Sequence, residues 1–98
     1  MGAVKIQDLK QIEKVSKALG DKHRLNILLH LTKKGGCAAC SEIIDIIDLA
    51  QPSISHHVKI LTEAGLIEAE KEGRNLKYTL NNNILDDYIN FLERLKND

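Results

Sequence analysis

The two cysteines of the chain, Cys37 and Cys40, are separated by two alanines, a spacing at which thiols can react with one another. In a reducing compartment such a pair is more often redox-active or metal-binding than structural. We expect a turn between them that opens a short helix and brings their Cα atoms within the roughly 4.4–6.8 Å that a disulfide needs. The pair therefore predicts a sensor, with thiol oxidation or sulfur species as the favoured signal.

Two other interpretations of these thiols stay open. They could bind a thiophilic ion such as Cu(I), Zn(II) or As(III), or they could be inert, small side chains. Zinc prefers a tetrahedral ligand set and arsenite a set of thiolates. The chain has no other cysteine, so only His30 or a partner subunit could supplement the pair. We predict no cofactor other than such an ion at Cys37 and Cys40.

The histidines do not combine into a metal site on the predicted helices. His23 and His30 are seven residues apart and share a helix face. The adjacent His56 and His57 point about 100° apart and do not easily chelate one ion. We expect His56 to face outward toward a phosphate or base, and His57 to be partly buried.

An enzymatic interpretation of the cysteine pair is a thiol-disulfide oxidoreductase. That fold places its Cys-x-x-Cys motif after a strand in a βαβ unit, whereas Gly35 and Gly36 here follow a predicted helix. No Ser/His/Asp set, phosphate-binding loop or His-Glu-x-x-His motif competes. We expect the protein not to be an enzyme.

Length and composition indicate one globular domain over residues 1–98, because a single core typically needs on the order of 100 residues. The 43% hydrophobic and 29% charged residues are typical of neither disordered nor membrane proteins. No apolar run approaches the roughly 20 residues of a bilayer span, and the N-terminus lacks an apolar signal core. We therefore expect a cytoplasmic protein with no membrane partner.

The charge is balanced overall but divided along the chain. There are 14 Lys and Arg and 14 Asp and Glu, yet the first 34 residues hold eight basic residues against three acidic ones. A chain divided in this way can present a positive face to nucleic acid. The 3% aromatic content argues against single-strand binding by base stacking.

Apolar periodicity predicts a mostly α-helical fold with a β-hairpin. Period-two segments at 66–71 and 76–80 flank a Gly-containing turn and predict the hairpin. Two short helices followed by a two-stranded wing make a winged helix-turn-helix, and the alternative is an α+β domain without a nucleic-acid role. The five expected helices cover about residues 8–19, 22–34, 40–47, 52–64 and 82 to the C-terminal end.

The outward face of the helix at 52–64 carries hydrogen-bonding side chains and no acid before Glu63. A phosphate surface would select such a set, whereas the structural alternative is a merely solvated face. The hairpin turn adds groups that can reach an adjacent minor groove. The residues expected to bind double-stranded DNA are Gln51, Ser53, Ser55, His56, Lys59, Arg74, Asn75 and Lys77.

Four segments follow one another between residues 17 and 74: KALGDKHRLNIL at 17–28, QPSISHHVKIL at 51–61, EAGLI at 63–67 and EGR at 72–74. Together they resemble the ArsR/SmtB family of winged-helix repressors. The resemblance implies a homodimeric repressor that pairs through its first and last helices and leaves operator DNA when an effector binds. A dimer presenting two such helices would read an inverted repeat.

The chain departs from the metal-sensing patterns of that family. Zinc-sensing members use acidic and histidine residues of the last helix, and the matching positions here are Asn82, Ile84, Leu95 and Asp98. A zinc site there is therefore not expected. Metalloid-sensing members carry Cys-x-Cys near the third helix, whereas the pair here is wider and slightly earlier.

The last predicted helix is apolar over a broader face than a small core needs. A second subunit would cover this surface. The residues expected in the dimer interface are Leu9, Ile12, Leu85, Tyr88, Ile89, Leu92 and Leu95.

Overall fold

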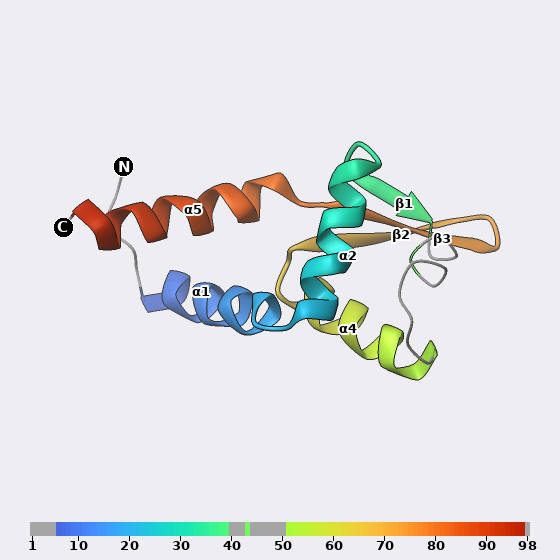
Figure 1. Cartoon of the computed structure of the whole chain (residues 1–98), viewed down its shortest axis with the longest axis horizontal. Helices are drawn as coiled ribbons and strands as arrows, with labels where there is room; N and C mark the ends of the chain where they lie inside the picture. Colours follow the sequence, from blue (N-terminus) through green and yellow to red (C-terminus); the bar gives the residue numbers. More distant parts are fainter. Residues whose placement is uncertain (1–5, 40–42, 44–50, 98) are drawn as a thin grey trace.

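A computed structural model describes residues 6–39, 43 and 51–97. The elements are α1 (Ile6–Leu19), α2 (Lys22–Lys33), β1 (Cys37–Ala39), α4 (Gln51–Glu63), β2 (Ile67–Glu72), β3 (Asn75–Leu80) and α5 (Asn82–Asn97). Figure 1 shows α1 and α5 side by side at one end of the molecule, and the β2–β3 hairpin projecting at the other end. No helix in the described ranges is long and apolar enough to cross a bilayer.

Helix α2 begins and ends with well-defined local chemistry. Asp21 has an extended backbone, and its carboxylate accepts hydrogen bonds from the backbone amides of His23 and Arg24, at 2.8 and 3.3 Å. These bonds satisfy amides that lack a partner inside the helix. At the other end, Gly35 and Gly36 have φ values of +77° and +102°, which side chains with a Cβ rarely adopt. The chain therefore leaves α2 abruptly and enters β1.

The sheet has the strand order β1-β3-β2, and both pairings are antiparallel. The register places Cys37 opposite Thr79 across the β1–β3 pair. Ile67 and Tyr78 are buried, so one face of the sheet packs against the protein interior. Gly73, with a φ of +60°, allows the tight turn between β2 and β3. These two strands form the wing.

The core lies where α2 and α4 meet the sheet and the C-terminal half of α1. Helix α5 is tied to α1 by a 2.9 Å hydrogen bond between the hydroxyls of Ser16 and Tyr88. Gln11 of α1 donates a side-chain hydrogen bond to the carbonyl of Ala64 at the end of α4. The buried residues are Val15, Ala18, Ile27, Leu28, Leu31, Ile43, Ile54, Val58, Leu61, Ala64, Leu66, Ile67 and Tyr78.

The structure confirms a mostly helical winged fold and corrects two details. Four of the five predicted helices are described; the predicted helix at 40–47 lies outside the described residues except for Ile43, which is helical and buried. The sheet has a third strand, β1, beside the two-stranded wing. Cys37 therefore lies in an extended strand and not in a turn that opens a helix, because Cys37 to Ala39 pair with β3.

Candidate nucleic-acid interface

Helix α4 separates a buried stripe from an exposed polar face. Ile54, Val58 and Leu61 are buried at spacings of four and three residues, which is the helical repeat. The structure places four predicted contact residues on the exposed side of α4, and Gln51 is the first residue of the helix. The exposed four are Ser53, Ser55, His56 and Lys59.

The end of α4 is held close to α1 and α5. Gly65 follows the helix with a φ of +81°, and its amide donates to the carbonyl of Thr62 at 3.0 Å. A Cβ at Gly65 would lie 3.4 Å from the side-chain nitrogen of Gln11 and 3.5 Å from Ile84. The positive φ therefore favours glycine at this position, whereas a Cβ would make only ordinary van der Waals contacts with the two neighbouring helices.

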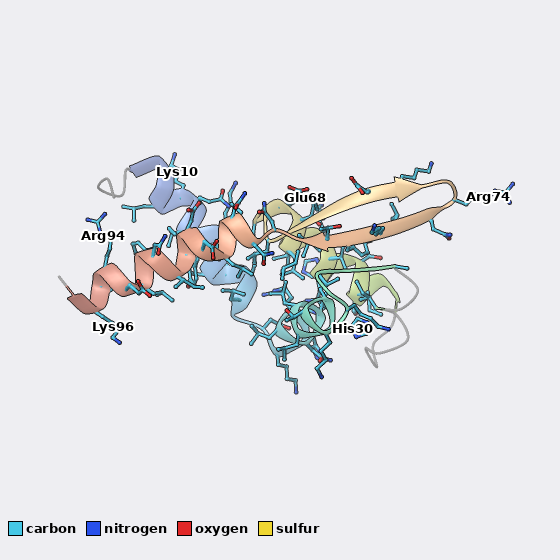
Figure 2. All side chains as sticks on the ribbon, turned by 90° about the horizontal axis from the view of Figure 1, so that it is seen from above. Lys10, His30, Glu68, Arg74, Arg94 and Lys96 are labelled. Atoms are coloured by element: carbon cyan, nitrogen blue, oxygen red, sulfur yellow. The ribbon has the colours of Figure 1, made fainter. Side chains whose placement is uncertain are left out.

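The wing supplies the second predicted contact region. Arg74 stands at the tip of the hairpin and points away from the protein, as Figure 2 shows. Asn75 is exposed beside it, and Lys77 is half-buried farther along β3, opposite Glu70 of β2. Lys71, an exposed residue of β2 near the tip, is a further cation that sequence reasoning missed. Acidic residues stand on both sides of it in the sequence, at Glu70 and Glu72, so no local basic pattern marks it.

The first turn of α4 and the wing tip lie at the same end of the molecule (Figure 1). A helix that enters a major groove and a hairpin that reaches the adjacent minor groove need this arrangement. The structure thus brings the helix residues and the tip residues together on one side, while α1 and α5 lie at the opposite end.

A junction that the sequence reasoning missed joins α1, α2 and α4. The Arg24 guanidinium donates to the carbonyls of Ala18 and Lys17 at 2.7 and 3.0 Å. Its third contact is to Nδ1 of His57 on α4, at 3.1 Å. The His57 side chain is only 12% exposed, as predicted, and its Nδ1 lies 4.0 Å from the Asp21 carboxylate.

The junction shifts the titration of two groups. Burial lowers the pKa of His57; the Asp21 carboxylate opposes this shift, and the Arg24 charge adds to it. For Asp21, desolvation raises the pKa, but the backbone hydrogen bonds from His23 and Arg24, together with the charges of His57 and Arg24, outweigh it and the pKa falls. Because the unfolded chain binds a proton at His57 more readily, this histidine stabilises the fold above pH about 6.5, and that contribution is lost as the pH falls.

The predicted dimer surface divides into two groups. Leu9 of α1 and Ile89, Leu92 and Leu95 of α5 are exposed. Ile12 is half-buried, while Leu85 and Tyr88 pack against the core of the same protomer. Four of the seven large hydrophobic residues that are exposed in the described ranges therefore belong to α1 and α5.

The cysteine pair is described only in part. Cys37 lies in β1, and Cys40 lies outside the described residues. Within residues 6–39, 43 and 51–97, no three His, Cys, Asp or Glu side chains come together as ligands for one metal ion. The described sheet is antiparallel throughout, so it lacks the parallel βαβ unit of a thiol-disulfide oxidoreductase.

The helices that pack on an antiparallel wing, with a polar outward face on α4, define a winged helix-turn-helix protein. Residues 19–70 match the model of a protein family described as a helix-turn-helix domain. The uncharacterized HTH-type transcriptional regulator MJ1325 of Methanocaldococcus jannaschii is 37% identical over 92% of this chain and 96% of its own length. The arsenical resistance operon repressor of Staphylococcus aureus is 38% identical over 82% of this chain and 75% of its own.

A solved structure agrees with these relatives. The homodimeric winged helix-turn-helix domain of Mb0332 from Mycobacterium bovis, described as a possible ArsR-family regulator, is 25% identical with a TM-score of 0.75. The match covers 98% of this chain and 88% of that one. The chain belongs to the ArsR/SmtB family of winged helix-turn-helix transcriptional regulators, which are DNA-binding proteins rather than enzymes.

Proposed function

We propose that this protein is a dimeric transcriptional repressor that acts in the cytoplasm and binds an inverted repeat in double-stranded DNA. The observation that carries the proposal is the exposed polar face of α4 at the same end of the molecule as the Arg74 tip of the wing. Two relatives support it, because one is named as an operon repressor and the other as a homodimer. The half-sites would be about one helical turn, roughly 34 Å, apart.

The side chains of α4 and the wing differ in what they can recognise. Hydroxyl and imidazole groups at Ser53, Ser55 and His56 can hydrogen-bond to base edges in a major groove. Lys59 and the wing cation Arg74 carry full charges, which suit phosphates and a narrow minor groove. Sequence preference and overall affinity therefore reside in different residues of one surface.

Substitutions should separate these two roles. In Ser53→Ala or His56→Ala protein, discrimination at defined base pairs should fall by about 1–3 kcal/mol. In Lys59→Ala or Arg74→Ala protein, affinity should fall for all sequences, and the slope of log affinity against log salt should decrease by about one. Fluorescence anisotropy with operator and scrambled duplexes at several salt concentrations measures both effects.

A lysine outside this surface provides the matched control. Lys10 is exposed on α1, far from the wing (Figure 2), so Lys10→Ala should leave both the affinity and the salt slope unchanged. If the Lys59→Ala and Arg74→Ala proteins bind like Lys10→Ala, this surface does not contact DNA and the proposed function is wrong.

We further propose that Cys37 and Cys40 receive the signal, with thiol oxidation favoured over metal binding. Cys37, Ala38 and Ala39 form the extended strand β1, in which the chain advances about 3.3 Å per residue. A disulfide at Cys37 needs its partner's Cα within about 4.4–6.8 Å, so we expect bridging to bend β1 away from full extension. Because Cys37 pairs with Thr79 of β3, such a bend would disturb the pairing that supports the wing.

Oxidation should therefore weaken operator binding. A disulfide-forming reagent such as diamide removes two protons and two electrons from the thiol pair, and affinity should fall by about 5- to 150-fold, with recovery in dithiothreitol. Cys37→Ser and Cys40→Ser proteins should bind DNA and ignore the reagent. Amide exchange at Thr79 should accelerate only in oxidised wild-type protein.

Titration with Zn(II), Cu(I) or As(III) under reducing conditions distinguishes the competing signal. A thiol-dependent loss of binding with one of these ions, and none with diamide, would establish metal sensing at the same residues. If wild-type and both serine proteins respond alike to every reagent, neither cysteine is a sensor.

A further inference from the structure

The contact between Arg24 and His57 defines the protonation state of the histidine. An arginine side chain has only hydrogen-bond donors, so Nδ1 of His57, 3.1 Å from the guanidinium, must be the acceptor. The imidazole then carries its single proton on Nε2. A protonated His57 has no acceptor and would place a second positive charge against Arg24.

We infer that Arg24 and His57 form a positioning contact that fixes the recognition helix α4 against the end of α1, and that this contact holds only while His57 is neutral. The inference rests on the proposed DNA binding by α4. Neither residue needs to touch DNA, because Arg24 is tied to carbonyls of α1 and His57 belongs to α4. Their effect on binding is therefore exerted through the orientation of α4.

Three bonds make Arg24 suited to this role. Two of them go to the carbonyls of Lys17 and Ala18 in the last turn of α1, the end of a helix that carries partial negative charge. The third holds His57 on the flank of α4, between the buried stripe and the exposed face. Helix α1 also carries part of the proposed dimer surface, so this contact relates the orientation of α4 to the dimer.

Protonation of His57 changes the balance of charges in the junction. At the N-cap of α2, a carboxylate oxygen of Asp21 lies 4.0 Å from Nδ1 of His57 and favours the protonated ring. That oxygen, however, already accepts hydrogen bonds from two backbone amides. Arg24 opposes the added charge, and so do the rings of His23 and His56 when they are protonated; their centroids lie 5.6 and 6.0 Å from that of His57. The protonated ring must therefore turn away from Arg24 or displace it.

The test compares pH profiles of operator affinity for wild-type and His57→Gln proteins. The glutamine carbonyl can accept the Arg24 hydrogen bond and does not titrate. The two proteins should bind equally at pH 7.5, and at pH 5.5 the wild type should be weaker than His57→Gln by about fivefold or more. The ratio of the wild-type affinity to the His57→Gln affinity is taken at each pH. Any effect of pH on DNA binding that both proteins share cancels in this ratio.

His23→Gln is the matched control, because the His23 ring lies 5.6 Å from that of His57, while the hydrogen bond with the Arg24 guanidinium is made by His57. It should keep the acid sensitivity of the wild type. His57→Ala should bind weakly at both pH values, because it lacks the acceptor. Long-range proton–nitrogen NMR provides a direct readout, in which wild-type His57 should show a bare Nδ1 and a protonated Nε2 at pH 7.5.

Two results would overturn the inference: a His57→Gln profile identical to that of the wild type, or a proton on Nδ1 at pH 7.5. Failure of the proposed function is a different outcome, because wild-type protein would then bind no operator at any pH. Arg24→Lys, which keeps the charge but lacks the forked geometry, should lose the acid sensitivity and bind like His57→Ala.

Discussion

Replacing Leu92 by glutamate is expected to convert the protein into folded monomers that no longer bind the operator. Leu92 is 43% exposed on α5, so the isolated protomer can accept a charge there at little cost. In a dimer that pairs through α1 and α5, the substitution places an unpaired carboxylate from each subunit in an apolar interface. Burying an unpaired carboxylate costs several kcal/mol per ion, so the subunits should separate instead. Operator affinity should collapse, because one protomer can engage only one half-site.

Leu76→Glu is a closely matched control for this prediction. Leu76 is 42% exposed, but it belongs to the wing and not to the proposed dimer surface. Sedimentation at micromolar concentration should therefore show a dimer for wild type and Leu76→Glu, and a monomer for Leu92→Glu. A Leu92→Glu protein that remains dimeric would show that the subunits pair through another surface.

Features set by neighbouring residues were predictable from the sequence. The stripe Ile54, Val58 and Leu61 is buried, and the predicted contacts His56 and Lys59 are exposed, because 3.6 residues per turn assign each position to a face without reference to the rest of the fold. The hairpin followed in the same way from alternation around a Gly-containing turn. These regularities depend on contacts within a dozen residues.

Features set by distant residues were missed. Strand β1 has three residues, too few for a period of two to be visible, and it exists because Cys37 and Thr79, far apart in sequence, pair across the sheet. The contact of Arg24 with His57 joins positions 33 residues apart. Asp21 also lies beside His57, but its residue type indicates only a helix N-cap and not this contact. Neither pairing can be derived from helix or strand periodicity.

The division of the molecule has a consequence for regulation. The proposed dimer surface lies at one end, the predicted DNA-contact residues lie at the other, and α2 passes between them (Figure 1). Helix α2 contacts α1, α4, β1 and β3, so it adjoins both the Arg24 junction and the strand that carries Cys37. A signal at the Arg24 junction would act on α4 through His57, and a signal at Cys37 would act on the wing through β3; α4, β1 and β3 all pack against α2.

The side chains buried around α2 should therefore make a large contribution to the free energy of unfolding. Leu31 is fully buried in this helix, and Leu31→Ala should lower the free energy of unfolding by about 2–5 kcal/mol, through lost apolar burial and a cavity that dense neighbours fill only partly. Leu29→Ala, in the same helix, is the control: Leu29 is 58% exposed, so the change should stay within about 0.5 kcal/mol. Urea denaturation measures both, at one protomer concentration because dimer stability depends on it. Equal midpoints for the two variants would contradict the packing of α2 described above.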